Sequence, residues 1–121
     1  MDTRRDFIYV KDMVDIILMA IDGKGSKGMY HISSASDYSI KELFDATVKA
    51  LSIKLDREVE MRPRGPDDAY TILLDPSKTI QDFGWKVTTP LEVGVQKTIE
   101  WYKKYGISQT YTHLRVHEEK K

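Results

Sequence analysis

The sequence predicts an α/β fold, a small sheet of short strands with about four helices. Short β-branched and aromatic runs alternate with stretches that repeat apolar residues at the helical period. Three of those stretches follow a helix-start signal. One signal is a capping box, and the other two contain proline. The chain has 121 residues, which suits one domain.

The first half of the chain predicts two strands and two helices. "RDFIYV" at 5–10 has the composition of a strand, and nothing precedes it that could pair with it. Residues 12–22 predict a helix that is apolar nearly all round and therefore requires neighbours on several sides. "GMYHIS" at 28–33 predicts a second strand, and Ser39 with Glu42 fits a capping box that starts the second helix.

The second half predicts two more short strands, at 59–63 and at 70–74, on either side of a loop rich in glycine, proline and aspartate. Asp75-Pro76 predicts the start of a brief helix that ends at Gly84. The segment "TPLE" at 89–92 repeats the capping-box spacing.

The last predicted helix runs to about Lys104, and Gly106 follows as its terminating residue. Beyond it the periodicity is lost and the chain ends in charge. We therefore expect one folded lobe at 1–106 and a partly disordered surface tail at 107–121.

Charge and composition exclude several classes of function. Nineteen basic residues balance nineteen acidic ones, which argues against a nucleic-acid binder and against an electrostatic membrane anchor. There is no cysteine, so neither a disulfide framework nor a thiolate metal site is expected. No apolar run is long enough to span a bilayer, and the first residues lack a signal peptide, so the expected location is the cytoplasm.

Gly23, Gly25 and Gly28 have the G-x-G-x-x-G spacing of dinucleotide-binding loops. That loop works where a strand delivers the glycines and a helix leaves them, whereas here the predicted order is reversed. We expect a plain helix-to-strand connection and no cofactor in this chain. His113 and His117 are four residues apart, and we expect them to be solvated surface residues and not metal ligands. No catalytic residue is predicted.

Arginines are the remaining candidates for chemistry. Arg62 and Arg64 flank Pro63, and side chains two apart in an extended backbone point to the same side, so both could grip one anion. Asp67 could pair with Arg64 or accept from a ribose hydroxyl. Arg5, next to Arg4, is a further basic site. On residue types alone, solvated charges or exposed salt bridges remain the simpler interpretation.

A family pattern adds to this interpretation. "RRDFIYVKDMVDIILMAI", "GMYHISSASDYSIKELFDATVKAL" and "RPRGPDDAYTILLDPSKTIQDFGWKVTTPLEVGVQKTIEWY" follow one another at spacings that resemble the C-terminal part of the NAD-dependent epimerase/dehydratase family. These extended short-chain dehydrogenases act on nucleotide-diphosphate sugars, as UDP-glucose 4-epimerase does. The resemblance covers residues 4 to about 106 and implies a substrate-binding lobe without the N-terminal Rossmann lobe, which holds NAD and the catalytic residues.

The resemblance also implies site residues. The arginine of R-D-F matches Arg5, which would contact the substrate diphosphate, and that of R-x-x-D matches Arg64, which would contact the diphosphate or the ribose. The loop is one residue longer than the family's common spacing, so either Asp67 or Asp68 takes the place of the acidic residue near the ribose. The usual Y-N-I-G-S-G is "YHISSA" here, which leaves that segment without an assigned role.

Two functions are consistent with this sequence. The first is a lobe that binds a nucleotide-diphosphate sugar and positions it for hydride transfer by a Rossmann lobe, with no turnover or NAD binding of its own. The second is a stand-alone, non-catalytic interaction module with the same fold. In both cases we expect the bare apolar surface to be covered by self-association or by the missing Rossmann lobe.

Overall fold

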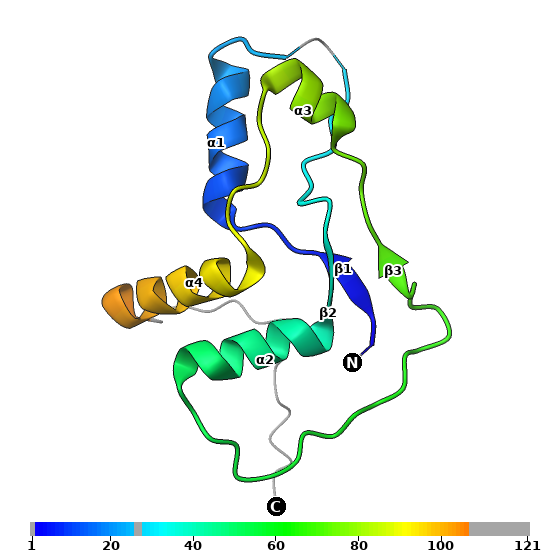
Figure 1. The fold of residues 1–121 in the computed structure, drawn as a ribbon, viewed down its shortest axis with the longest axis vertical. Helices are drawn as coiled ribbons and strands as arrows, with labels where there is room; N and C mark the ends of the chain where they lie inside the picture. The colour runs from blue at the N-terminus through cyan, green and yellow to red at the C-terminus, as the bar shows by residue number, and fades with distance from the viewer. Residues whose placement is uncertain (1, 26–27, 107–121) are drawn as a thin grey trace, which may run out of the picture.

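The computed structural model describes residues 2–25 and 28–106, and this part of the chain has the predicted α/β fold with four helices and a small sheet (Figure 1). The sheet has three strands, β1 (Arg4–Asp6), β2 (Asp37–Ser39) and β3 (Thr71–Ile72), in the order β2-β1-β3. β1 is antiparallel to β2 and parallel to β3. Both strands that pair with β1 follow it in the chain.

The four helices lie close to their predicted positions. They are α1 (Val10–Ile21), α2 (Ile40–Leu51), α3 (Ser77–Phe83) and α4 (Leu91–Tyr105). The capping box at α2 is confirmed, because Ser39 Oγ accepts from the Glu42 amide and the Glu42 carboxylate accepts from the Ser39 amide. The second box is wrong. The N-cap of α4 is Pro90, which places Glu92 one residue too early to reach back.

The strand predictions hold only in part. Residues 28–33 and 59–63 form no strand, the first strand keeps only Arg4–Asp6, and β2 occupies a stretch without a strand prediction. A strand exists only where a second backbone supplies hydrogen-bond partners, and the described residues supply none to these two segments. β-branched composition alone is therefore a weak guide in this chain.

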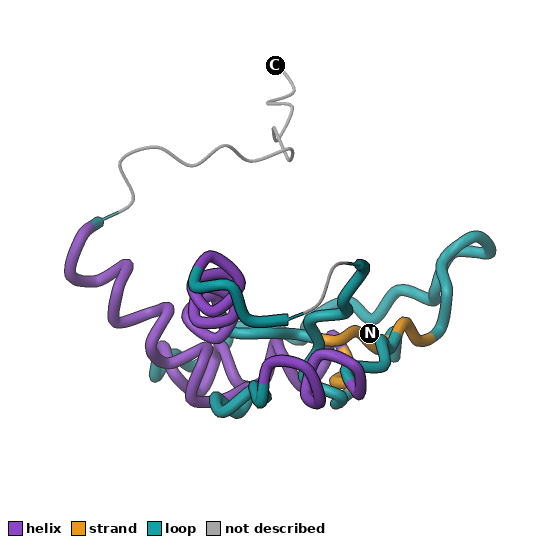
Figure 2. The backbone as a smooth tube through the Cα atoms, turned by 90° about the horizontal axis from the view of Figure 1, so that it is seen from above, coloured by secondary structure: helices purple, strands orange, loops and turns teal. Residues whose placement is uncertain are grey.

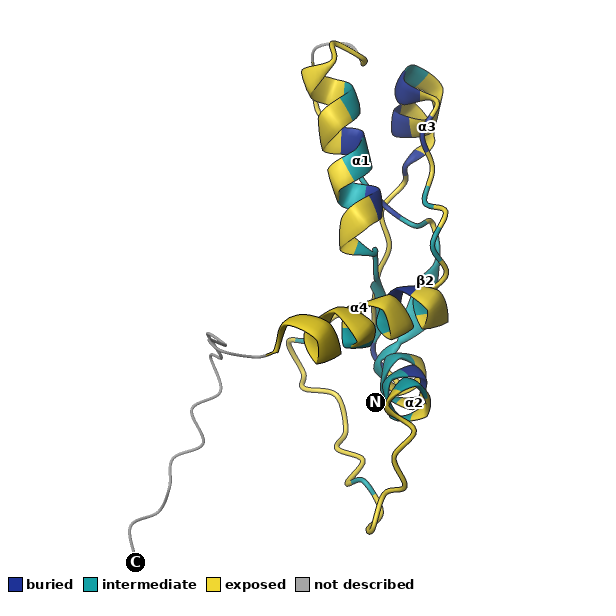
Figure 3. Ribbon diagram, turned by 90° about the vertical axis from the view of Figure 1, so that its left-hand side faces the viewer, coloured by how far each residue is buried: buried dark blue, intermediate teal, exposed yellow. Residues whose placement is uncertain are grey.

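The elements form two ends joined by the sheet. α1 and α3 lie side by side at one end, and α2 packs against α4 at the other (Figure 1, Figure 3). Ile16, Phe83 and Trp85 form the buried cluster of the first end. Residues 52–70 form a long connection without helix or strand that leads around the edge of the sheet to β3 (Figure 2).

Burial is sparse. Besides Pro76 and Gly94, only four apolar residues of the described chain are buried, namely Ile16, Ala46, Phe83 and Trp85. Figure 3 shows most of α1 exposed, as are Val14, Ile17, Leu18 and Ile21. Among the described helices, none has the length and apolar character that crossing a membrane requires.

Candidate functional site

The two arginines of the first strand point to opposite faces of the sheet. Side chains alternate along a strand, and Arg4 pairs with Asp37 at 3.0 Å and lies 3.5 Å from Glu42 at the start of α2. The hydrogen bond from Arg4 lowers the pKa of Asp37, and the same bond raises the pKa of Arg4. Arg4 thus ties strands and helix together, and the two arginines do not form one basic site.

Arg5 binds the loop that precedes β3. Its Nη2 atom lies 2.5 Å from Oδ1 of Asp68, and Nη1 donates to the carbonyls of Arg4 and Ala69 at 2.7 and 2.9 Å. The side chain of Arg5 is 27% exposed and that of Asp68 43%. The guanidinium is fixed by three acceptors and still reaches solvent.

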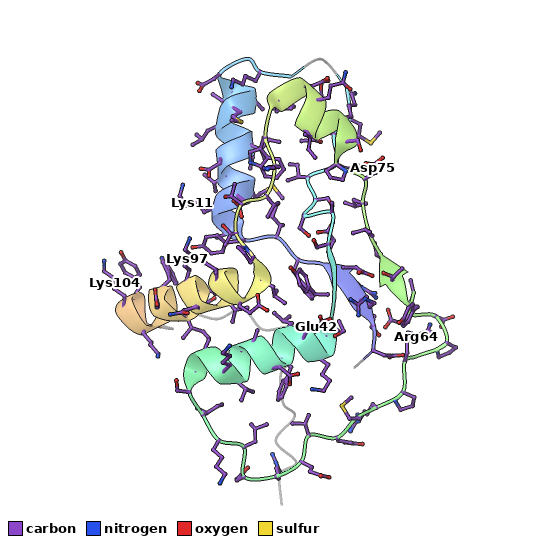
Figure 4. The ribbon with its side chains drawn as sticks, viewed as in Figure 1. Lys11, Glu42, Arg64, Asp75, Lys97 and Lys104 are labelled. Atoms are coloured by element: carbon purple, nitrogen blue, oxygen red, sulfur yellow. The ribbon has the colours of Figure 1, made fainter. Side chains whose placement is uncertain are left out.

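Arg64 meets the same residue from the other side. Its Nη1 donates to the backbone carbonyl of Asp68 at 2.5 Å, and its guanidinium carbon lies 5.9 Å from the ring centroid of Tyr70. Figure 4 shows Arg64 beside the end of the sheet where β1 and β3 meet. Two guanidinium groups that are 59 positions apart in the sequence therefore converge on Asp68, one through its carboxylate and one through its carbonyl.

The other two predicted site residues, Arg62 and Asp67, have different surroundings. Arg62 forms an ion pair with Glu60 at 3.1 Å, and the two side chains are 80% and 72% exposed. Arg62 therefore has a partner other than Asp68. Asp67 is exposed, whereas Asp68 is half-buried and faces Arg5. The loop length left either Asp67 or Asp68 as the acidic residue of the site, and in the structure it is Asp68 that contacts the arginines.

Three cavities, of about 650, 560 and 220 Å³, are lined by other residues. The largest of the three lies between α2, α4 and the segment that follows β1. Its lining is mostly apolar, including Phe7, Leu43, Val95 and Ile99, with three threonines and two tyrosines. The arginine pair lies outside these cavities and is part of the open surface.

The described residues lack one feature of a dinucleotide-binding loop. None of the three connections that lead from a described strand into a helix contains a glycine, so the phosphate-cradling turn is missing from this part of the chain. Gly23 and Gly25 follow the carbonyl end of α1 instead. Gly25 has a φ of +86°, and a Cβ there would lie 2.4 Å from the ring of Phe83, so close packing explains this glycine.

No group of three or more potential metal ligands occurs within the described residues. The candidate pair His113 and His117 lies outside them, as does the predicted tail at 107–121.

Several supporting residues escaped sequence reasoning. Thr3 is buried and its hydroxyl lies 3.3 Å from Oδ2 of Asp68, on the same side of the strand as Arg5. The two-residue spacing in a strand was the signal that could have found it. The carboxylate of Asp6 accepts from the hydroxyls of Ser33 and Ser34, which gives the "YHISSA" segment a structural role.

Comparisons with known proteins agree with this picture. The family model described as GDP-mannose 4,6 dehydratase matches residues 1–98. The chain is 30% identical to UDP-glucuronate 4-epimerase 1 of Arabidopsis thaliana, over 86% of this chain and 27% of that protein.

Two solved enzymes of Bordetella bronchiseptica are similar in structure. WbmH in complex with NAD+ has a TM-score of 0.76 and 48% identity, over 87% of this chain and 35% of that one. WbmG in complex with NAD and UDP has a TM-score of 0.79 and 33% identity, over 94% of this chain and 37% of that one. The chain thus spans about a third of the length of these relatives.

Proposed function

The chain belongs to the family of NAD-dependent nucleotide-sugar epimerases and dehydratases, and on that premise we propose that it is a lobe that binds the diphosphate of a nucleotide sugar. Arg5 and Arg64 are the proposed diphosphate ligands. Asp68 is the proposed neighbour of the ribose. Arg62 and Asp67 are left outside the proposed contact. Arg62 pairs with Glu60, and Asp67 is exposed, whereas Asp68 contacts both arginines.

The observation that carries the proposal is the convergence of Arg5 and Arg64 on Asp68. Arginine presents donors in a planar fork that matches phosphate oxygens, and such charge-assisted bonds are stronger than neutral ones. Two such forks that contact one residue, one from a strand and one from a loop, suit the two phosphates of a diphosphate. The complex of WbmG with UDP supports a uridine diphosphate as the first ligand to try.

The proposed role is positioning. Arg5 is fixed to a strand and to two carbonyls, so little side-chain freedom remains to be lost when a ligand binds. Binding energy gathered at the diphosphate holds the sugar in place for chemistry elsewhere, which is how remote contacts contribute to catalysis. No proton or hydride transfer is assigned to the residues of this chain.

Calorimetric titration with UDP and UDP-glucose tests the proposal. We expect binding by the wild-type chain and a loss of at least about tenfold in affinity for Arg64→Ala, because a bond to a charged group is removed. Arg57→Ala is the matched control, since Arg57 is an exposed arginine of the same long loop. Absence of binding, or equal losses in both variants, would contradict a specific diphosphate site.

A second candidate function, the non-catalytic interaction module, is favoured by one observation. The apolar residues of α1 remain exposed, with Val10 at 66% and Ile21 at 74%. A soluble monomer rarely leaves such a continuous apolar face bare. A stoichiometric protein complex without nucleotide binding would favour this candidate over the first.

A further inference from the structure

We propose that two copies of this chain associate through an antiparallel pairing of their α1 helices, in which Ile21 of each copy covers the largest apolar cavity of the other. The pairing is independent of the proposed diphosphate site, because α1 and that cavity share no residue with the cluster of Arg5, Arg64 and Asp68. It follows from the spacing of one exposed stripe and from what lies at the two ends of that stripe.

α1 has two apolar sides. One side holds the buried Ile16, which packs with Phe83 and Trp85. The other side, roughly opposite, is an exposed stripe of four β-branched residues, namely Val10, Val14, Ile17 and Ile21. At 3.6 residues per turn, these four positions lie within about 60° of one another around the helix axis. Figure 3 shows α1 buried on its side toward α3 and exposed elsewhere, so the stripe is open to solvent in a single copy.

The spacing of the stripe is the same in both directions along the helix. Its steps are four, three and four residues, the pattern with which two helices interlock side chains along one seam. A second copy that runs the opposite way therefore matches it. Val10 then meets Ile21 of the partner subunit, and Val14 meets Ile17 of the partner subunit. The contact is identical on both copies, as two-fold symmetry requires.

The cavity at one end of the stripe favours the antiparallel direction. Val10 belongs to the lining of the cavity of about 650 Å³, together with Leu91 and Ile99 of α4. Ile21, at the other end of α1, is 74% exposed, more than the other three residues of the stripe. An antiparallel pair brings Ile21 of the partner subunit to Val10 and to this cavity, and does so twice. A parallel pair would bring Ile21 to its own counterpart and leave both cavities without an apolar occupant.

Charge does not oppose the contact. The stripe itself is uncharged, and Lys11 at its margin is paired with Asp15 of the same helix at 3.0 Å. The whole chain has a formal net charge of zero. Proteins near zero net charge associate more readily than strongly charged ones, so two copies can approach without long-range repulsion.

The area of the stripe determines the strength of the dimer. Complete burial of a valine or isoleucine side chain removes on the order of 100 Å² from water, and the residues of the stripe are 44% to 74% exposed. Leu18, which borders the stripe, is 53% exposed. Two copies therefore bury several hundred Å² of side-chain surface, less than the about 1,200 Å² of a standard stable interface. We expect a reversible dimer that dissociates on dilution.

Disulfide mapping tests the direction, since the wild-type chain has no cysteine. Val10→Cys and Ile21→Cys are mixed in equal amounts and oxidised in a glutathione buffer, and intact mass spectrometry separates the products. In the antiparallel pair the two copies of position 10 lie about 16 Å apart along the axis, too far for a disulfide. We expect at least about tenfold more mixed disulfide than either like-with-like disulfide, against about twofold for random collision.

Met29 supplies the matched controls, because it is 81% exposed and lies outside α1. Val10→Cys mixed with Met29→Cys is expected to give only the ratio of random collision. In sedimentation velocity, we expect Ile21→Ala to raise the dissociation constant of the dimer at least about fivefold and Met29→Ala to change it less than about twofold. Circular dichroism checks that each variant is folded.

An excess of like-with-like disulfides, or the random ratio in both mixtures, would overturn the antiparallel pairing. A wild-type chain that remains monomeric at about 1 mM would overturn the association itself and leave the stripe to a different partner. Calorimetry with UDP is unaffected by either result, so a failure of the pairing and a failure of the proposed function are distinguishable.

Discussion

Arg4 and Arg5 are neighbours of identical chemistry that have unrelated surroundings. The first is enclosed by Asp37, Glu42 and the sheet, and the second is turned to the loop that carries Asp68. Only the strand's alternation separates them. The same holds for Asp67 and Asp68, where a one-residue difference decides which carboxylate meets an arginine.

The ion pair of Arg4 makes a prediction about acid stability. Hydrogen bonds from Arg4 and then from Thr71 lower the pKa of Asp37 below its ordinary 3.8. A lowered pKa stabilises the fold above the unfolded value, and that contribution is lost as the pH falls through the folded value. We therefore expect the urea concentration at the unfolding midpoint of the wild-type chain to decrease when the pH is lowered beneath about 4.

Asp37→Asn removes this dependence. The variant is expected to be less stable than the wild type at pH 6 and close to it at pH 3, as measured by urea unfolding at both values. Asp45→Asn is the control, because Asp45 has its ion pair with Lys41 on the exposed side of α2. Parallel pH profiles for the wild type and Asp37→Asn would show that the Arg4 pair has no such role.

At the scale of elements, helix starts were more predictable than strands. A helix satisfies its own backbone, so a local signal such as the Ser39 capping box is sufficient to place its beginning. A strand needs a second segment, and the residues at 28–33 have strand composition without a described ladder partner. α3 starts one residue later than Asp75-Pro76 predicts, since Pro76 is its N-cap and no side chain caps it, although Asp75 accepts from the amide of Ser77 at 2.9 Å.

The two apparent capping boxes give a matched comparison. Ser39→Ala removes a real cap of α2 and is expected to cost about 1 kcal/mol of unfolding free energy. Thr89→Ala at α4 removes no cap bond, since that helix has none from a side chain, and is expected to cost less than about 0.5 kcal/mol. Chemical denaturation of both variants measures the difference, and equal costs would count against the cap assignment.

At the scale of the molecule, the exposed face of α1 dominates. Four apolar residues of α1 are between 44% and 74% exposed, namely Val14, Ile17, Leu18 and Ile21. The described chain buries only four apolar residues besides Pro76 and Gly94. Apolar surface of this extent favours association with another surface. We expect the chain to self-associate as its concentration rises.

Leu18→Glu tests this expectation, because Leu18 is 53% exposed and a charge there disturbs the α1 surface without entering the core. Sedimentation velocity over a range of micromolar concentrations is expected to show larger species for the wild type and fewer for the variant. Lys11→Glu, on the same helix but at a polar position, controls for the added charge. A wild-type chain that stays monomeric throughout would refute the prediction.

The sequence by itself determined the fold class, the four helices and the family, because helical periodicity, caps and motif spacing are local properties that the chain carries along its length. It also identified Arg5 and Arg64 as candidates. Only the tertiary structure decided that both contact Asp68, that Arg62 pairs with Glu60, and which short runs become strands. Those outcomes depend on contacts between segments far apart in the chain. No local pattern specifies which distant backbone or side chain will form the contact.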